Sequence, residues 1–380
     1  MKVSDRVVIL GDGESAVMVA NKIVQKAARG DVEVIVVGKN KRLEFSDSNA
    51  FVPVSLIDQG SSRRNLDSLL RMNVTFIRDE PVSLNLKDNI VSTKGGKIIR
   101  YDHIILTDYM HPDPSKIMGY NEDARSIETL EGAMSLKEDL SNFKKGDIVI
   151  YHDNTSLFNP INSVNLAINI FNYFQSKGNG NDIKINCVFS SELISGNKEL
   201  DGIIESTLKS TGIEFTKGFK LTGFNVKNKE LQSSDGKAIK YDIPIIFSPS
   251  SYSPYVESAN FPKADSGNIE VNMKDLTLKG FENVFIMGYE GTTFTNYWKV
   301  NRGQANFISS RIAFMVSGYP EPDHYVYTYD SVMIKGKELA SSIVSSLDGK
   351  LVEGRPSRTD YLVALYSHEA FFGTYALGFI

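Results

Sequence analysis

The chain has 380 residues, of which 41% are hydrophobic and 23% charged, and its formal net charge is −4 at pH 7. This length is too great for one ordinary hydrophobic core and predicts two or three folded domains. The net charge is small and negative, and it does not indicate the positive surface that binds nucleic acid. We therefore expect no nucleic-acid partner.

The single cysteine, Cys187, excludes an internal disulfide and any metal site built from several cysteines. The five histidines are scattered along the chain, so we expect no bound metal. The first residues lead directly into a strand, and no apolar run reaches the roughly 18 residues of a membrane span. We therefore expect a cytoplasmic protein without a signal peptide.

The first predicted unit consists of a strand, a glycine-rich turn, a helix and a second strand. Val7–Leu10 is a continuous apolar run, which is typical of a strand buried on both faces of a parallel sheet. The turn at Gly11–Ala16 reads G-x-G-x-x-A, and apolar residues recur after it at helical spacing. Val32–Val37 predicts the second strand, which makes this a βαβ unit.

The glycine-rich turn predicts a binding site for a diphosphate group. Gly11 and Gly13 let the backbone turn tightly and approach a diphosphate, which then rests on the helix N-terminus. The small Ala16 lets the helix pack closely on the strand, and Glu14 and Ser15 complete the predicted loop. The alternative is a βαβ turn that binds no ligand.

The second strand lacks the acidic residue that usually binds the ribose hydroxyls of a dinucleotide. Gly38 stands in that place, and Lys39 and Asn40 follow it. We expect the side chain of Asn40, or a backbone amide of this segment, to contact the ribose instead.

A short sequence motif occurs twice in the chain. Gly96–Asp102 precedes the apolar run Ile104–Leu106, and the similar Gly236–Asp242 precedes Ile245–Phe247. In each half, a predicted apolar strand precedes this motif. Repetition at this domain-sized period predicts two copies of one fold unit rather than a solenoid.

The order of these parts resembles the two-dinucleotide-domain flavoproteins, most closely the sulfide:quinone oxidoreductase and flavocytochrome c sulfide dehydrogenase group. The resemblance is carried by the Gly11–Ala16 loop, the aromatic-proline segment Phe51–Pro53, the hairpin with Tyr101-Asp102, the segment Gly119–Ala133 and the late strand Phe281–Gly288. It covers nearly the full length of the chain.

This resemblance implies an α/β fold, with two tandem Rossmann-like domains of the FAD/NAD(P)-binding type and a small C-terminal domain. The FAD-binding domain would be discontinuous, with residues 1–112 and 245–320. The second Rossmann-like domain would span residues 113–244, and residues 321–380 would form a C-terminal segment for interface or membrane contact.

The resemblance also implies FAD as the cofactor, with contacts at Thr107, Gly288, Tyr289 and Lys299. Lys299 opens the helix that, in the family, directs its N-terminus at the flavin ring; the alternative is an ordinary solvated lysine. Three of the implied contacts depart from the family pattern, and the first is Gly38 in place of the acidic residue. Asp108 replaces the glycine of an Ala-Thr-Gly turn, and Tyr289 replaces an aspartate that binds the ribityl chain.

The second unit lacks the features needed for NAD(P) and for sulfide chemistry. The turn after Ile148–Ile150 contains no glycine, so we expect no NAD(P) site. The family's paired cysteines are absent near Ser156–Pro160 and near Val332-Met333. Cys187 lies in an apolar strand, where it is expected to be a small core residue. Sulfide oxidation by the family's cysteine mechanism is therefore excluded.

The C-terminal sixty residues form a separate segment. Gly318–Asp323 is rich in turn-forming residues, and alternating residues at Tyr325–Met333 predict a strand. Residues 361–380 are apolar and aromatic. Two alternatives stay open for them: peripheral contact with the inner face of a membrane or with quinone, and packing within the protein or in a homo-oligomer.

Two functional hypotheses follow. The first is an FAD-dependent oxidoreductase that passes electrons from an unknown donor to a quinone or a protein acceptor, with no catalytic side chain assigned. The second is a non-catalytic paralogue that has lost flavin and acts as a structural or partner subunit.

Overall fold

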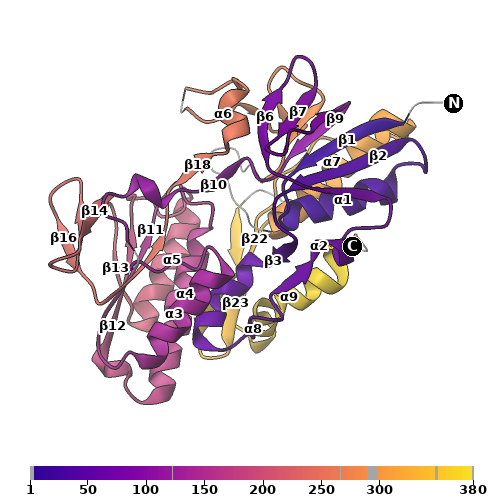
Figure 1. The fold of residues 1–380 in the computed structure, drawn as a ribbon. Coiled ribbons are helices and arrows are strands. Elements are labelled where there is room, and N and C mark those ends of the chain that lie inside the picture. The colour runs from indigo at the N-terminus through magenta and orange to yellow at the C-terminus, as the bar shows by residue number, and fades with distance from the viewer. Residues whose placement is uncertain (1–3, 122, 266, 289–297, 347–349, 379–380) are drawn as a thin grey trace.

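The computed structural model describes residues 4–121, 123–265, 267–288, 298–346 and 350–378. Two sheet-and-helix units lie side by side, and the short pair of β10 (Met110–Pro112) and β18 (Ser250–Tyr252) runs between them (Figure 1). The sheets and covering helices of both units confirm the α/β fold class, with parallel strands at the centre of each unit.

The first unit is built on a seven-stranded sheet in the order β19-β20-β21-β9-β1-β2-β5. The strands β21, β9, β1, β2 and β5 are parallel neighbours, and β20 and β19 add an antiparallel edge. The bounds of these strands are β1 Asp5–Leu10, β2 Val32–Gly38, β5 Val74–Arg78, β9 His103–Leu106, β19 Val271–Asn272, β20 Thr277–Leu278 and β21 Val284–Ile286.

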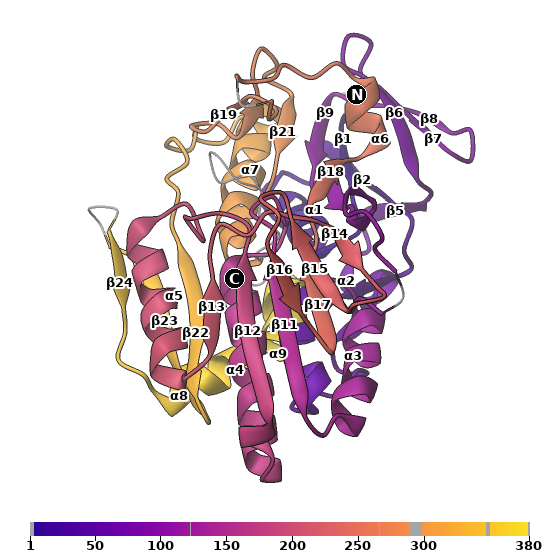
Figure 2. The same cartoon turned by 90° about the vertical axis from the view of Figure 1, so that its left-hand side faces the viewer.

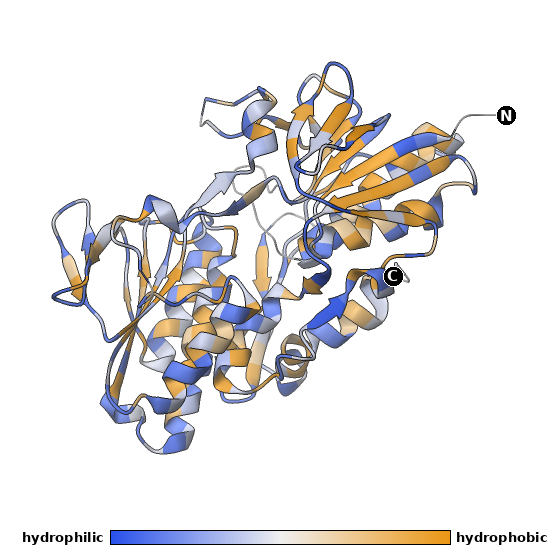
Figure 3. Ribbon diagram, viewed as in Figure 1, coloured by the Kyte–Doolittle hydropathy of each residue, from blue (hydrophilic) through white to orange (hydrophobic). Residues whose placement is uncertain are grey.

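Apolar residues dominate β1 and β2, as Figure 3 shows, because both faces of this sheet are covered. The helices α1 (Glu14–Lys26) and α7 (Trp298–Ser317) pack against each other on one face. The other face carries α6 (Pro254–Ser258) and the three-stranded sheet β6-β7-β8. That sheet has the bounds β6 Pro81–Asn85, β7 Ile90–Thr93 and β8 Ile98–Arg100.

The second unit has a four-stranded parallel sheet in the order β13-β12-β11-β17, and the three-stranded sheet β14-β15-β16 lies beside it. The bounds of its elements are α3 Leu130–Asn142, β11 Gly146–His152, α4 Pro160–Lys177, β12 Ile183–Phe189, α5 Lys198–Thr211, β13 Glu214–Thr216, β14 Leu221–Asn225, β15 Glu230–Ser233, β16 Ala238–Lys240 and β17 Ile243–Phe247.

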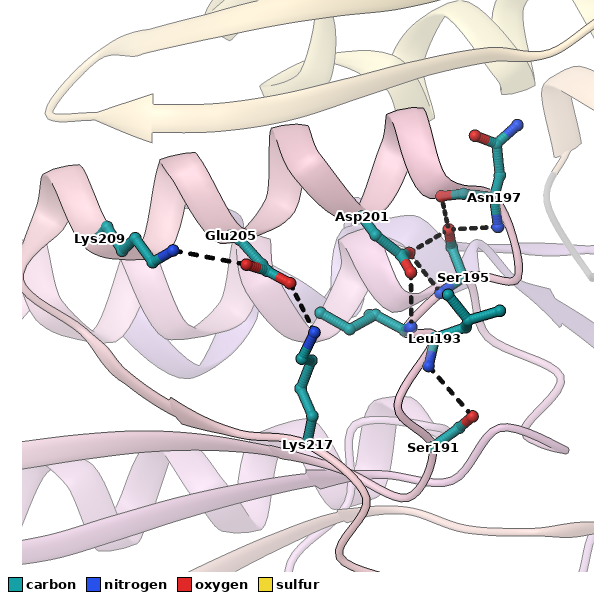
Figure 4. A network of polar contacts seen from close by, with 9 residues as sticks. Ser191, Leu193, Ser195, Asn197, Asp201, Glu205, Lys209 and Lys217 are labelled. Atoms are coloured by element: carbon teal, nitrogen blue, oxygen red, sulfur yellow. Dashed lines mark hydrogen bonds and ion pairs between the residues drawn. The ribbon is translucent and has the colours of Figure 1, made fainter.

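A polar network holds the start of α5 to the loop before it (Figure 4). Asn197 caps the helix, since its side chain accepts hydrogen bonds from two first-turn amides. Asp201 accepts hydrogen bonds from the amides of Ile194 and Ser195, at 2.9 and 2.8 Å. One turn further along, Glu205 forms an ion pair with Lys217 at 2.8 Å. These contacts fix the connection from β12 to α5.

The two units confirm the internal repeat predicted from the sequence. In the first, Asp102 Oδ2 accepts a hydrogen bond from the amide of Arg6 at 2.7 Å, just as β1 begins. In the second, Asp242 Oδ2 accepts one from the amide of Asp147 at 3.0 Å, at the start of β11. Each repeated Tyr-Asp pair therefore ties the end of its hairpin to the opening strand of its own unit.

One predicted boundary differs from the strand pairing. β17 pairs with β11, so the sheet of the second unit continues to Phe247, beyond the boundary predicted at 244/245. The strand lies there because its five residues are all buried between the layers of that unit. The other domain boundaries stay predictions.

The remaining elements join the two units or form the C-terminal part. The connecting elements are β3 Arg42–Glu44, the 3-10 helices Ser46–Ala50 and Val52–Val54, β4 Arg63–Asn65, α2 Leu66–Leu69, β10 Met110–Pro112 and β18 Ser250–Tyr252. The C-terminal elements are β22 Asp330–Gly336, β23 Leu339–Ser345, β24 Leu351–Glu353, α8 Arg358–Leu365, α9 Ser367–Ala370 and a π-helical turn at Phe371–Tyr375. Figure 2 shows β22, β23 and β24 beside α5.

The strand predicted over residues 325–333 begins later than expected. β22 starts at Asp330, and Val332, Met333 and Ile334 are all buried instead of alternating. This strand contacts α4 and α8, and its apolar side chains belong to the core that it shares with them. Tyr325 belongs elsewhere, because its ring lies 5.7 Å from that of Phe307 on α7.

The apolar C-terminal segment packs largely on the protein itself. Phe371 and Phe372 are buried beside Phe45, with ring centroids 5.0 and 6.2 Å from it. Val363 and Tyr366 are exposed, at 48% and 55%. Among the described residues, none of the helices combines the length and apolar character needed to cross a bilayer.

Candidate functional site

A cleft of about 650 Å³ runs along the carboxyl ends of β1, β2 and β9. This is the edge at which open α/β sheets bind their ligands. One wall carries the loop Gly11–Gly13, and Lys39 and Asn40 lie at the end of β2. Tyr255 also lines the cleft, and Leu157 and Phe158 reach it from the second unit.

The glycine-rich loop requires its first glycine. Gly11 has a φ of +141°, and a Cβ atom built there would lie 2.0 Å from Thr107 Oγ1. The loop therefore packs directly against the end of β9. Gly13 is the N-cap of α1 and offers no side chain to cap it. The first-turn amides of α1 consequently need another hydrogen-bond acceptor, which is the property that makes such a helix start bind anions.

The carboxylate of Asp108 reaches this loop. Its Oδ2 accepts a hydrogen bond from the amide of Asp12 at 3.0 Å, and the amide of Gly13 donates to the same carboxylate. Removal from water, followed by the nearby charge of Asp12, raises the pKa of Asp108 to about 6. A diphosphate would need these amides and would meet two carboxylates. The amides that a diphosphate would use are therefore already bonded to a side chain of the protein.

The contact expected from Asn40 is made with Asp12. The amide of Asn40 donates to Asp12 Oδ2 at 2.7 Å, and its Nδ2 donates to Oδ1 at 3.0 Å. The side chain of Asp12 also leaves no room for a side chain at position 38. A Cβ atom built on Gly38 would lie 2.4 Å from the Cβ of Asp12. An acidic side chain thus does lie at the end of β2, but it comes from the glycine loop.

Six of the predicted site residues line the cleft. The residues in the cleft are Gly11, Gly13, Lys39, Asn40, Thr107 and Gly288. Ser15 and Ala16 are buried inside α1, and Tyr289 lies outside the described residues. The side chain of Glu14 points beneath the loop, where its Oε1 accepts hydrogen bonds from the amide and hydroxyl of Ser46. Burial raises the pKa of Glu14 to about 8.

Lys299 is placed away from this cleft. Its Nζ forms an ion pair with Asp330 at 2.9 Å, and it lines a second, smaller cavity of about 40 Å³. Asp47 and Asn162 line the same cavity, where burial raises the pKa of Asp47 to about 6. The amide of Gly288 donates to Gln304 Oε1 at 2.6 Å, so that amide is already bonded within the protein.

Sequence reasoning missed two polar residues of the cleft, Tyr255 and Asn301. Both line it, both are at least 98% buried, and within the described part of the chain neither the phenol nor the side-chain amide has a hydrogen-bond partner. Buried polar groups rarely go without partners, so these two indicate room for a ligand. Asn301 lies in a segment that the resemblance had marked, whereas Tyr255 had no signal in the sequence.

The corresponding position in the second unit is closed by the protein. α4 begins with Pro160, and the Asn159 side chain caps it by accepting a hydrogen bond from the amide of Ile161 at 2.9 Å. Cys187 is buried within β12, and burial raises the pKa of its thiol to about 12. No cluster of three or more potential metal ligands occurs among the residues that the structure describes.

Comparison with known proteins identifies related chains at low sequence identity. No family model matches the chain. The mitochondrial sulfide:quinone oxidoreductase of Dictyostelium discoideum is 20% identical over 295 residues, which is 74% of this chain. The match spans 64% of that protein's length, so this chain covers just under two thirds of it.

Solved structures share the fold over nearly the whole chain. The sulfide:quinone oxidoreductase of Aquifex aeolicus superimposes with a TM-score of 0.81 at 13% identity, covering 99% of this chain and 92% of that one. A chain in the mitochondrial ATP synthase of Tetrahymena thermophila gives a TM-score of 0.80 at 14% identity, covering 98% and 96%. The fold is that of the FAD/NAD(P)-binding two-domain oxidoreductases. The chain is thus a divergent protein similar to the sulfide:quinone oxidoreductases in sequence and fold, and it contains one cysteine.

Proposed function

We propose that this chain is a flavin-dependent oxidoreductase that binds FAD in the cleft along β1, β2 and β9, and that it passes electrons from a donor other than sulfide to a quinone or a protein acceptor. The observation that carries this proposal is a pair of buried polar side chains, Tyr255 and Asn301, which line a cleft of about 650 Å³ and have no hydrogen-bond partner among the described residues. A cleft of this volume is within the range of cofactor sites.

The parts of the cleft suggest how FAD would be held. The start of α1 would hold the diphosphate, because its amides lack a capping side chain. The end of β2, with Lys39 and Asn40, would lie at the adenosine side, and Gly288 and Asn301 at the flavin side. When bound, a flavin supplies the two-electron redox chemistry, so the protein needs no nucleophile of its own.

The single thiol of the protein, at Cys187, offers no path for electrons from the donor to the flavin. Cys187 is 1% exposed, and the raised pKa of its thiol keeps it protonated in the core of the second unit. A lone thiol also cannot form an internal disulfide. Electrons would therefore enter the flavin directly from the donor, and the apolar side chains of Leu157 and Phe158 would limit the access of water to the cleft.

A reductive assay tests this function. Protein loaded with FAD is exposed anaerobically to candidate donors, and the visible flavin band is followed before and after a soluble quinone is added. We expect bleaching by a donor and recovery with quinone or an electron-carrier protein, both retained in Cys187→Ala. Loss of turnover in Cys187→Ala, or a bound flavin that no donor or chemical reductant in solution can reduce, would contradict the proposal.

A second candidate function is a non-catalytic structural subunit. The Asp108 carboxylate on the amides of Asp12 and Gly13 favours it, because an ionised side chain there excludes a diphosphate. The fold also occurs in a chain of the Tetrahymena ATP synthase, which indicates that it can belong to a large assembly. Co-purification of the native protein in a stoichiometric complex, together with no uptake of FAD at any pH, would decide for this function.

A further inference from the structure

Asp108 occupies hydrogen-bond donors that a diphosphate would otherwise use. Its Oδ2 lies 3.0 Å from the amide nitrogen of Asp12, and the amide of Gly13 also donates to the carboxylate. A Cβ atom built on Gly13 would lie 3.5 Å from Asp108 Oδ1, so the carboxylate is in contact with the helix start itself. The negatively charged group bound to the loop amides is thus a side chain of the protein itself.

The backbone of Asp108 is held in place on both sides. Its amide donates to the carbonyl of Leu10 at 3.3 Å, and its carbonyl accepts a hydrogen bond from Ser253 Oγ at 2.8 Å. The loop amides can therefore be freed by a change in the side chain alone. Rotation of the carboxyl group into the cleft would free the amides, and uptake of a proton would remove the negative charge that opposes a diphosphate.

The groups that face Asp108 favour uptake of a proton. Asp12 lies in the loop, Glu14 at the start of α1 and Tyr255 on α6, and none of these three carries a positive charge. Desolvation and the charge of Asp12 raise the pKa of Asp108 to about 6. Lys39 and His111 line the same cleft, together with the carboxylates of Glu44, Glu80 and Glu128.

The hydroxyl of Thr107 is a further contact of Asp108, and it opposes the effect of burial only weakly. It lies 2.9 Å from the carbonyl of Leu10 and 3.3 Å from Asp108 Oδ1. A hydroxyl has one proton to donate, and the shorter contact to the carbonyl competes for it. The longer contact, in which Thr107 Oγ1 is the donor, therefore lowers the pKa of Asp108 by less than burial raises it.

We propose that Asp108 is the specificity-determining residue of the glycine-rich loop: ionised, it excludes a dinucleotide diphosphate from the start of α1, and neutral, it admits one. The proposal rests on the proposed function, because it concerns the same cleft and the same class of ligand. According to this proposal, binding of a dinucleotide is coupled to protonation of Asp108.

Titration of the full-length protein with FAD tests this inference. Binding is measured by calorimetry and flavin fluorescence from pH 5 to pH 8, for the wild type, Asp108→Asn and Asp108→Gly. Glu128→Gln is the matched control, because it removes a carboxylate from the same cleft without touching the loop amides. Riboflavin, which lacks the diphosphate, is the control ligand.

We expect the affinity of the wild type for FAD to fall about tenfold for each pH unit above about 6, as the linkage of one proton requires. At pH 8, Asp108→Asn should bind FAD about 100-fold more tightly than the wild type and should show little dependence on pH. Glu128→Gln should keep the pH dependence, and riboflavin binding should not follow it.

Three results would overturn the inference while leaving the proposed function intact. They are equal binding of FAD by the wild type and Asp108→Asn at pH 8, an equal gain in Glu128→Gln, and the same pH dependence for riboflavin. Absence of FAD binding by the wild type and both Asp108 variants at every pH would instead refute the proposed function, and the inference with it. The pH profile of the wild type needs no variant, so it stays informative if a substitution prevents folding.

Discussion

Lys299 Nζ lies 2.9 Å from Asp330 Oδ1, and this ion pair joins the start of α7 to the start of β22. The lysine side chain is only 13% exposed. Its charge is therefore matched within the protein, and the pair ties the first unit to the C-terminal segment.

Breaking this ion pair should destabilise the protein more than breaking an exposed one. Lys299→Met removes a lysine that is only 13% exposed and leaves its partner Asp330, which is 38% exposed, so we expect a loss of about 1–2 kcal/mol in the free energy of unfolding. Lys279→Met is the matched control, because Lys279 and Glu270 form an exposed pair whose loss should cost less than about 1 kcal/mol. Urea unfolding of both variants measures the difference, and equal losses would contradict the prediction.

The first glycine of the loop should not tolerate a side chain, whereas the second should. Gly11→Ala combines a φ of +141° with a Cβ atom 2.0 Å from Thr107 Oγ1, so we expect a loss of about 1–3 kcal/mol or more. Gly13 has a φ of −83°, and its added Cβ would meet Asp108 at an ordinary 3.5 Å. Thermal unfolding should show little change in Gly13→Ala, and a larger loss there than in Gly11→Ala would be inconsistent with this loop geometry.

The local parts of the fold could be predicted from the sequence because they depend on neighbouring residues. The apolar strand, the glycine turn and the amphipathic helix of the first unit occur where the pattern places them, at β1, the Gly11–Gly13 loop and α1. The repeated Tyr-Asp hairpins were also recognisable, since each copy is followed by a similar apolar run. The position of Cys187 in a buried strand followed from its apolar neighbours.

The contacts that decide the chemistry of the cleft could not be predicted in this way. Asp108 was recognised as a departure from glycine, but its contact with Asp12 joins segments far apart in the chain and depends on how β9 lies beside β1. The binding of Asn40 to Asp12 likewise depends on the parallel pairing of β1 and β2. The alternation that predicted a strand from Tyr325 failed because Tyr325 packs on α7 instead.

Glu14 should make the protein less stable as the pH rises. Its folded-state pKa of about 8 lies above the ordinary value of 4.5, so the folded state binds the proton more tightly. The stability that this proton provides is present at acidic pH and is lost as the pH rises from about 4.5 to about 8, by at most about 1.4 kcal/mol per pH unit.

The variant Glu14→Gln isolates this effect. It should remove that part of the pH dependence while keeping the carbonyl acceptor for Ser46. Urea unfolding at pH 5 and pH 8 compares the variant with the wild type and with Glu131→Gln, a change of an exposed carboxylate. A wild type that loses no more stability than Glu14→Gln between these pH values would show that Glu14 is not buried as described.

The thiol of Cys187 should be unreactive in the native protein. It is 1% exposed, and burial raises its pKa to about 12, so almost no thiolate is present at neutral pH. A chromogenic disulfide reagent should label it only after unfolding in urea. Rapid labelling of the folded protein would contradict its place in the core of the second unit.

The presence of a dinucleotide cofactor is the central claim, and the flavin content of the purified protein tests it most directly. Protein incubated with FAD at pH 5.5, where Asp108 is mostly protonated, is passed through a desalting column and then denatured, and the released compound is identified by mass spectrometry. The account predicts about one FAD per chain, as expected for one cleft of this kind. A colourless protein that releases no FAD after this treatment would contradict it.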